Sequence, residues 1–250
     1  MSRVVAAGNQ GMHEPGQAVG RMQVKAPCAR DLPSDTARRR RAMTRVVVAG
    51  LGGFGALTAL IGTSDLEAID DGITARLQAV RGPAVERAMS FVSWFGFPPQ
   101  GRVLPPAYAA ALWLRRYRLE AVFQLVAWGA APLGSLIKSS VGRPRPAAGK
   151  DVRVVAAPLD GSSFPSGHVL TYVGVYGWMA YMAHRLIVPA LPRRLAVAAL
   201  TTLVAAVGPS RVYLGHHRPS DVAASYLLGS SCLAAMIVVY RRLRPQGASR

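Results

Sequence analysis

Long apolar stretches alternate with short polar segments along most of this 250-residue chain. A helix needs about 20 residues to cross a hydrocarbon core of about 30 Å. Six stretches approach this length, although the second is interrupted by Phe97-Pro98-Pro99 and the fourth and fifth are short: 45–63, 87–113, 119–137, 167–183, 194–209 and 222–240. The pattern therefore predicts an all-α protein, an integral membrane bundle of six transmembrane helices.

The two polar ends of the chain are predicted to lie outside this bundle. Residues 1–43 are rich in Gly and Arg and lack apolar periodicity, which is typical of a disordered tail. The sequence thus predicts three parts: a disordered basic tail over 1–43, a transmembrane domain over 44–244, and a short C-terminal tail over 245–250.

Composition agrees with a membrane protein. Hydrophobic residues make up 51% of the chain and charged residues only 17%, whereas charged residues are about a quarter of an ordinary soluble domain. The net charge of +18 could indicate a nucleic-acid-binding protein. However, the basic residues form short clusters between apolar stretches, without base-stacking aromatic residues beside them. We therefore expect the bilayer, and no nucleic acid, as a partner.

The basic clusters also predict how the helices are oriented, because cytoplasmic loops of membrane proteins carry an excess of Lys and Arg. With six spans, four clusters fall on one side of the membrane: Arg38–Arg41 with Arg45, Arg115 with Arg116 and Arg118, Arg185 with Arg193 and Arg194, and Arg241 with Arg242 and Arg244. Both termini are then cytoplasmic, and the loops 64–86, 138–166 and 210–221 are extracytoplasmic.

Two of these extracytoplasmic loops hold most of the unusual polar residues. The loop after the third span reads KSSVGRPRP and contains Lys138, Arg143 and Arg145. Such a cluster is ordinarily a set of anchors at a helix end. The positive-inside rule, however, leaves this side of the membrane poor in Lys and Arg. We therefore expect these cations to have a further role.

The fourth span is introduced by GSSFPSGH, a typical helix start. A proline suits the first helical position, and Ser163 lies close enough to cap the helix. The amides of Ser166 and Gly167 would then be unpaired donors at the positive end of the helix dipole, which favours an anion. His168 is expected to point into the same space, unless it is simply a hydrogen-bonded histidine at a helix end.

The stretch SRVYLGHHRPSD supplies Arg211, His217 and Asp221. Pro219 indicates the start of the sixth helix, so Asp221 lies nearly one turn after His217 and is expected to accept its imidazole N–H. That bond would leave the other ring nitrogen free as a base or nucleophile. Alternatively, Asp221 only caps the helix. His216 is one residue out of register and is expected to point elsewhere.

Together these groups suit phosphoryl transfer without a metal. Cations and helix amides can stabilise the phosphate oxygens while one histidine attacks and another protonates the leaving group. The loop 64–86 also contains an acidic patch. Its residues lack an ordered ligand spacing, so we interpret the patch as a solvated loop face and not as a metal site: Asp65, Glu67, Asp70 and Asp71.

Three motifs resemble those of the type 2 phosphatidic acid phosphatase superfamily. Residues 138–146 fit K-x6-R-P, residues 165–168 read P-S-G-H, and residues 210–221 fit S-R-x5-H-x3-D. This superfamily includes the lipid phosphate phosphatases and, more distantly, bacterial acid phosphatases and vanadium haloperoxidases. The resemblance covers about residues 60–240. The chain differs where Ala224-Ser225 replaces a common glycine, a change that bears on headgroup preference.

The resemblance implies a membrane phosphatase that hydrolyses a lipid phosphate or diphosphate through a phosphohistidine intermediate, without a metal or other cofactor. It makes His217 the nucleophile, Asp221 the residue that orients and activates it, and His168 the general acid. It also implies a phosphate-binding set: Lys138, Arg145, Arg211, Ser166 and Gly167. The active site is expected at the extracytoplasmic face of a bacterial inner (plasma) membrane.

Several alternatives remain open at this point. The substrate classes are phosphatidate-type lipids, including phosphatidylglycerophosphate, and undecaprenyl diphosphate. A non-catalytic protein of the same fold that binds or transports anionic lipids is the alternative to an enzyme. His217, Asp221 and His168 argue against it, because binding needs cations but no activated nucleophile. The apolar spans disfavour a haloperoxidase, and the oligomeric state is not indicated.

Overall fold

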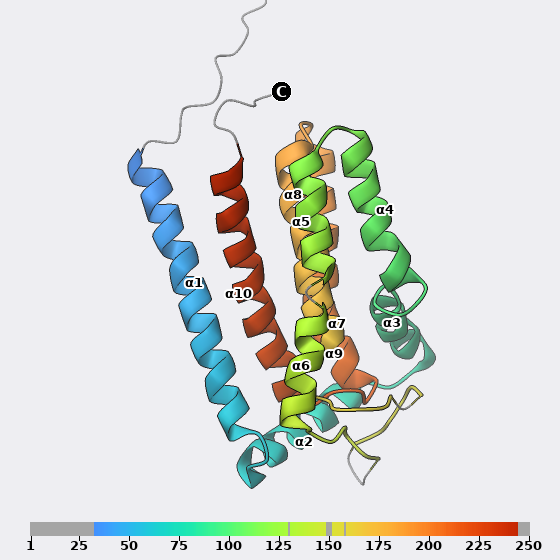
Figure 1. The fold of residues 1–250 in the computed structure, drawn as a ribbon. Helices are drawn as coiled ribbons and strands as arrows, with labels where there is room; N and C mark the ends of the chain where they lie inside the picture. The colour runs from blue at the N-terminus through green and yellow to red at the C-terminus, as the bar shows by residue number, and fades with distance from the viewer. Residues whose placement is uncertain (1–32, 130, 149–151, 158, 245–250) are drawn as a thin grey trace, which may run out of the picture.

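The computed structural model describes residues 33–129, 131–148, 152–157 and 159–244, and every regular element in these ranges is helical (Figure 1). The elements are α1 (Pro33–Leu60), α2 (Ser64–Gln78), α3 (Pro83–Trp94), α4 (Gln100–Leu114), α5 (Arg118–Gly129), α6 (Ala131–Val141), α7 (Gly167–Thr171), the π-helical η1 (Tyr172–Tyr176), α8 (Gly177–Leu186), α9 (Ala190–Tyr213) and α10 (Pro219–Leu243). The prediction of an all-α protein is confirmed.

Four helical runs within the described residues are long and apolar enough to cross a membrane: Arg41–Leu60, Arg118–Val141, Ala190–Tyr213 and Pro219–Leu243. They correspond to the first, third, fifth and sixth predicted spans. The second predicted span, 87–113, is instead divided between α3 and α4, with Pro98 and Pro99 between them. Proline ends a helix because it lacks the amide N–H and its ring clashes with the preceding turn.

The fourth predicted span, 167–183, lies on α7, η1 and α8, which follow one another without a break. At the N-terminus, the predicted boundary of the disordered tail differs from the structure. Helix α1 begins at Pro33, so residues 33–43 are helical. Arg and Ala are strong helix formers and extend the apolar helix outward. Residues 1–32 and 245–250 of the predicted tails lie outside the described residues.

The run α7–η1–α8 occupies the centre of the bundle, in contact with α5, α9 and α10. Val169, Tyr172 and Val175 are fully buried at its beginning, and Trp178 and Met182 are fully buried farther along. The hydroxyl of Tyr172 donates to the Val92 carbonyl (2.6 Å), which ties this run to α3. Side chains at the start of α7 are therefore held by a packed core.

Helix α1 packs against α10 through small residues. A Cβ added at Gly50 would lie 2.9 Å from the Leu227 carbonyl and would collide with the Ser231 hydroxyl. Small residues allow such close approach of helix backbones in membranes. The rest of α1 is largely exposed, as expected for a helix that contacts lipid.

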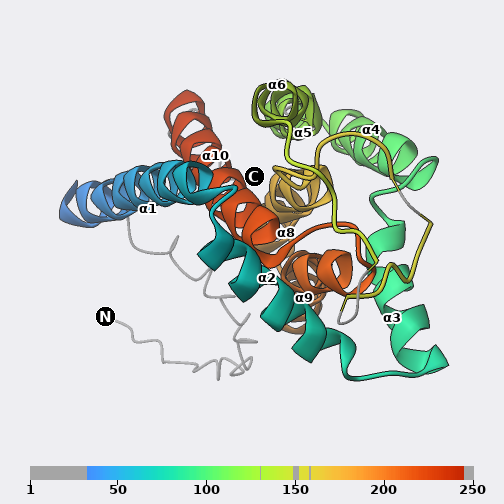
Figure 2. The ribbon, with the colours of Figure 1, turned by 90° about the horizontal axis from the view of Figure 1, so that it is seen from below.

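The connections between helices gather at the two ends of the bundle (Figure 1). The start of α1, the α4–α5 and α8–α9 connections and the end of α10 lie at one end, and these segments carry the basic clusters. The loop 142–166, the α9–α10 connection and α2 lie at the other end. Figure 2 shows α2 lying across that end beside α9 and α10. The predicted loop 64–86 is thus mostly helical, being α2 and the beginning of α3.

Candidate active site

The three motifs converge at the α2 end of the bundle. Lys138 is in the last turn of α6, Arg211 is in the last turn of α9, and His217 lies between α9 and α10. The charges of Arg145 and Arg211 are close enough to act on His217. Lys138 lies within electrostatic range of both arginines. Residues up to 79 positions apart in the sequence therefore surround one space.

The imidazole of His217 is only 2% exposed and is oriented by a main-chain carbonyl. Its Nδ1 lies 2.7 Å from the Ser163 oxygen but 3.8 Å from Asp221 Oδ2. A carbonyl can only accept, so Nδ1 carries the proton and Nε2 keeps a free lone pair. The loop before α7 thus presents a closer acceptor for this N–H than Asp221, the partner expected from the sequence.

Burial lowers the pKa of His217 to about 4; Asp221 opposes this decrease, whereas Arg211 and Arg145 add to it. The ring is therefore neutral at neutral pH, which is the form with a nucleophilic nitrogen.

Asp221 is fully buried and caps α10 while it pairs with Arg143. Its Oδ2 accepts the Arg218 amide at 2.9 Å, and its Oδ1 accepts Nη1 of Arg143. The alternative role of a helix cap is thus present in the structure. The carboxylate also places a negative charge 3.8 Å from the His217 ring, where it favours the positive form of the imidazole.

The start of α7 differs in detail from the prediction. The helix begins at Gly167, so Pro165 precedes the cap instead of opening the helix. Ser163 does not cap it, because its hydroxyl donates to the Pro144 carbonyl. The Ser166 amide is not free either, since it donates to Ser225 Oγ at 2.7 Å. The serine at the unusual Ala224-Ser225 position therefore fixes the loop.

Two groups at this helix start still suit an anion. Within the described residues, the Ser166 hydroxyl is buried and has no hydrogen-bond partner. A Cβ built on Gly167 would meet no atom of those residues within 4 Å, so the space beside it is open. A ligand oxygen could occupy this position without a clash.

Arg211 is fully buried, and only some of its hydrogen-bond donors have partners. Its Nη1 donates to Ser93 Oγ at 3.1 Å, and its guanidinium carbon lies 5.1 Å from the centre of the Phe97 ring. Its Nε and Nη2 have no hydrogen-bond partner among the described residues. An unpaired buried donor costs about 1–3 kcal/mol, and more when it is charged. These donors therefore favour a bound anion.

Arg145 is held by three main-chain carbonyls. Its Nη1 donates to the His216 oxygen at 2.8 Å, and Nε and Nη2 donate to the oxygens of Asp160 and Gly161. A guanidinium has five N–H donors, so each Nη atom keeps a second one. The loop therefore orients this side chain and leaves donors for a ligand.

His168 lies against the turn between α3 and α4. Its ring centre is 4.5 Å from that of Phe97, and Gly96 packs directly on its edge. Its Nε2 is buried without a hydrogen-bond partner in the part of the chain described here. Phe97 therefore contacts both His168 and Arg211, a role that the sequence signalled only as an interruption of an apolar stretch.

His216 borders this space: its ring centre lies 6.4 Å from that of Phe97, and its Nδ1 is buried without a hydrogen-bond partner among the described residues. The expectation that it points elsewhere stays a prediction. The Nε2 of His216 lies 3.0 Å from the Ala157 carbonyl, and burial, with the charge of Arg211, lowers its pKa to about 4. The main-chain oxygen of His216 holds Arg145. The residue thus supports the site through its backbone.

The members of the acidic patch differ in how exposed they are in the structure. Asp65 and Asp71 are exposed, as predicted. Asp70 is only 1% exposed and forms an ion pair with Arg143 at 2.9 Å, so its assignment to a solvated face is wrong. Across the described ranges, no group of three or more His, Cys, Asp or Glu side chains could hold a metal ion. The expectation of a metal-free reaction stays a prediction.

Three comparisons relate this chain to known proteins. The PAP2 superfamily model matches residues 109–245. Phosphatidylglycerophosphatase B of Bacillus subtilis (strain 168) is 27% identical over 182 residues, a match that covers 69% of this chain and 84% of that protein. The fold is similar to the crystal structure described as the first transmembrane PAP2 type phosphatidylglycerolphosphate phosphatase from Bacillus subtilis. That similarity has a TM-score of 0.70 at 23% identity and covers 82% of this chain and 98% of the other.

These similarities agree with the long apolar helices and with the three motifs. The chain is an integral membrane protein and a homologue of PAP2-type membrane lipid phosphatases. The family model spans more than half of its length and includes all three motifs, 138–146, 165–168 and 210–221. The prediction made from those motifs is confirmed: the chain belongs to the PAP2 superfamily.

Proposed function

We propose that this protein hydrolyses a lipid phosphate by way of a phosphohistidine at His217. The observation that carries the proposal is the free Nε2 of a buried, neutral His217 beside the unpaired Nε and Nη2 of Arg211 and the unpaired Nε2 of His168. Phosphatidylglycerophosphate is the first substrate to test, because a homologue bears the name of that activity. Phosphatidate, lysophosphatidate and undecaprenyl diphosphate are the other candidates.

In the first step, Nε2 of His217 attacks phosphorus and the bond to the leaving oxygen breaks. The proton stays on Nδ1, which donates it in a hydrogen bond to the Ser163 carbonyl, and the nearby charge of Asp221 stabilises the ring as it becomes positive. His168 donates a proton to the leaving oxygen. In the second step, His168 takes a proton from water, which attacks phosphorus and frees His217 and inorganic phosphate.

The phosphate oxygens are bound by Arg211, Arg145 and Lys138. Guanidinium groups suit phosphate because two parallel N–H donors match two of its oxygens. The Ser166 hydroxyl and the open space at Gly167 complete the binding set. Fixed donors of this kind stabilise the charge that develops in the transition state.

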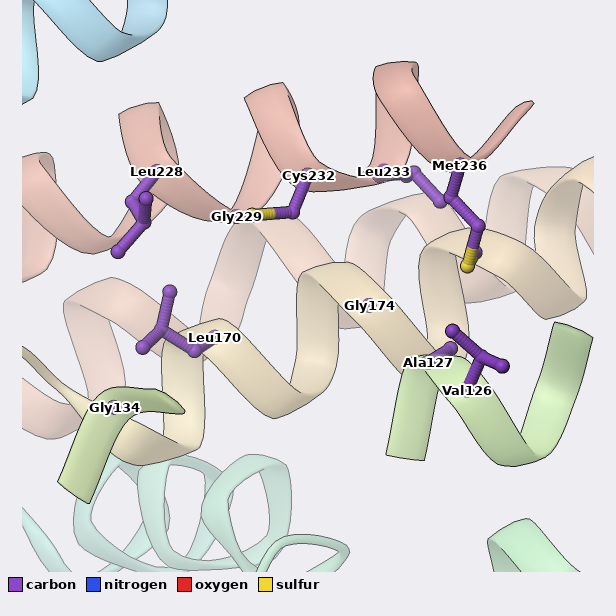
Figure 3. A pocket seen from close by; sticks show the side chains of 10 residues that line it. All are labelled: Val126, Ala127, Gly134, Leu170, Gly174, Leu228, Gly229, Cys232, Leu233 and Met236. Carbon is purple, nitrogen blue, oxygen red and sulfur yellow. The ribbon is translucent and has the colours of Figure 1, made fainter. Parts of the chain in front are cut away.

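An apolar cavity of about 120 Å³ supports a lipid as the substrate (Figure 3). Side chains of α5, α7 and α10, with glycines of α6, η1 and α10, line it. Three lining residues, Gly134, Leu170 and Gly229, lie four positions from Lys138, Ser166 and Ser225 respectively, which is about 6 Å along a helix. A hydrocarbon chain in this cavity would leave its headgroup near the cations.

We further propose that six segments cross the membrane. α3 with α4 and the run α7–η1–α8 would add two crossings to the four long helical runs. The basic clusters at the end opposite the site would then be cytoplasmic under the positive-inside rule. The active site would face the extracytoplasmic side.

The proposal is tested with purified protein in detergent, assayed for phosphate release from the four lipids with EDTA present. The wild type should release phosphate from at least one of them. His217→Ala should lower kcat by at least about 1,000-fold, since it removes the nucleophile. The matched control is His216→Ala, which should keep most of the activity, because its ring points to Ala157.

Two results would contradict this function. Full activity of His217→Ala would remove the phosphohistidine mechanism. Binding of the four lipids by the folded wild type without phosphate release would instead support a non-catalytic lipid-binding protein.

A further inference from the structure

We propose that Asp70 of α2 is a positioning residue that holds His217 in its reactive place, through Ser220 and Arg143. The inference rests on the proposed function of His217. α2 lies outside residues 109–245, which match the family model. A helix at the surface of the bundle end would thus contribute to the reaction without touching the substrate.

Asp70 is a buried charge with several partners. Its Oδ1 accepts the Ser220 amide at 2.8 Å, and its Oδ2 accepts the Ser220 hydroxyl at 2.6 Å and Nη2 of Arg143 at 2.9 Å. The side chain is only 2% exposed. A buried carboxylate persists only when such partners offset the loss of hydration. The contacts therefore fix α2, the loop and α10 relative to one another.

The first connection to His217 runs through the beginning of α10. Ser220 is in the first turn of this helix, where amide groups lack intrahelical acceptors. Asp70 accepts the amide of Ser220, and Asp221 accepts the amide of Arg218. Two carboxylates from different helices thus set where α10 begins. His217 comes two residues before that helix, so its backbone is fixed by the same bonds.

The second connection runs through Arg143. Its guanidinium lies between Asp70 and Asp221, and its main-chain oxygen accepts the Ser163 amide at 2.8 Å. The Ser163 oxygen in turn lies 2.7 Å from Nδ1 of His217. Ser163 orients His217 and is itself bound to Arg143. The Asp70–Arg143 ion pair therefore helps to hold the carbonyl that orients the His217 ring.

Asp70 also keeps Arg143 from pairing with Asp221 alone. Arg143 is 3% exposed and has both carboxylates as partners, so each carries only part of the neutralisation. Without the charge of Asp70, Asp221 would be the only carboxylate paired with Arg143. The positive charge of Arg143 would then offset more of the negative charge of Asp221, and Asp221 would stabilise the positive His217 ring less. Both effects act on the chemical step. Arg145 and Arg211 are held by other contacts, so ground-state binding should change little.

The test is Asp70→Asn, which keeps the shape and the acceptor for the Ser220 amide but removes the charge. The neighbouring Asp71→Asn is the matched control, because Asp71 is exposed on the same helix. Steady-state kinetics with the lipid that the wild type hydrolyses best should show kcat about tenfold lower for Asp70→Asn, with KM within about twofold. Asp71→Asn should match the wild type in both constants.

The outcomes separate this inference from the proposed function. An inactive wild type would defeat the proposed function itself. An active wild type with an unchanged kcat in folded Asp70→Asn, or a raised KM at constant kcat, would overturn only the role of Asp70. If Asp70→Asn does not fold, Ser220→Ala decides, because it removes only the hydroxyl between Asp70 and Arg143. A lower kcat at constant KM then supports the inference, and an unchanged kcat overturns it.

Discussion

At the scale of the residue, the partner of His217 determines its chemistry. The Ser163 carbonyl orients the ring through Nδ1, while Asp221 lies farther away at 3.8 Å. A main-chain carbonyl carries less charge than a carboxylate, so it fixes the tautomer but favours the protonated ring less. This arrangement, together with burial, is consistent with the lowered pKa of His217. Ser163 belongs to the loop that also leads to His168, so one segment positions both histidines.

The lowered pKa values predict how stability depends on pH. His216 and His217 have a pKa of about 4 in the folded protein, against about 6.5 when unfolded. The unfolded chain therefore binds more protons between these values, and stability rises with pH across this window. The stability that depends on these two histidines should be fully present above pH 6.5 and should be lost progressively as the pH falls to about 4.

Thermal unfolding in detergent at several pH values between 7.5 and 4.5 measures this effect. The double variant His216→Gln/His217→Gln should lose less stability than the wild type over that interval. Parallel curves for the two proteins would show that these histidines are not responsible.

The residue types of the site were predictable from sequence, but several of their partners were not. The spacing of His217 and Asp221 indicated a contact, and it could not reveal that a loop carbonyl lies closer. Asp70 is 73 positions from Arg143 and lies in an acidic run typical of surface loops. Only the tertiary packing of α2 across α9 and α10 buries it.

At the scale of the element, the turn between α3 and α4 forms one wall of the site. Proline ends α3 early and breaks an apolar stretch that the sequence pattern predicted as a span. The break brings Gly96 and Phe97 against His168. The pattern indicated the interruption at Phe97-Pro98-Pro99, but hydropathy carries no information about which distant helix such a turn contacts.

Gly96→Ala should weaken catalysis by displacing His168, the proposed general acid. The added Cβ would lie 2.5 Å from Cδ2 of His168 and 2.9 Å from the Tyr172 ring, so the His168 side chain has to move. Misplacing a catalytic group by about 1 Å can cost about 100-fold in rate. We expect kcat for the best lipid substrate to fall by about 10-fold to 100-fold.

Gly52→Ala is the control, because a Cβ there meets no atom of the described chain within 4 Å. It should leave kcat unchanged. An active Gly96→Ala variant with wild-type kcat would mean that His168 does not need its present position.

At the scale of the whole molecule, the basic clusters predicted to be cytoplasmic and the motif residues lie at opposite ends. The basic clusters surround the end with the α4–α5 and α8–α9 connections, and the motif residues lie at the α2 end (Figure 1). This separation was predictable from the order of apolar stretches and basic clusters. Which segments cross the membrane was less predictable, because two of the six predicted spans are broken or irregular helices.

Cysteine labelling in intact cells tests the proposed orientation. In a variant with Cys28 and Cys232 replaced by Ala, a cysteine at Ala148 should react with a membrane-impermeant maleimide added outside. A cysteine at Val188, which is 84% exposed in the α8–α9 connection, should react only after the membrane is permeabilised. Labelling of Val188→Cys in intact cells would reverse the assigned orientation.

The π-helical turn η1 sets the phase between the two halves of the central helix. Such a turn accommodates one residue more than an α-helical turn. Deleting one residue within Tyr172–Tyr176 would let this turn close as an ordinary α-helical turn, so His168 and Trp178 would keep nearly the same relative orientation. An extra residue accommodated without a π turn would instead rotate His168 by about 100° relative to Trp178 and move it away from Phe97. Homologous helices therefore align correctly only if this single-residue insertion is counted.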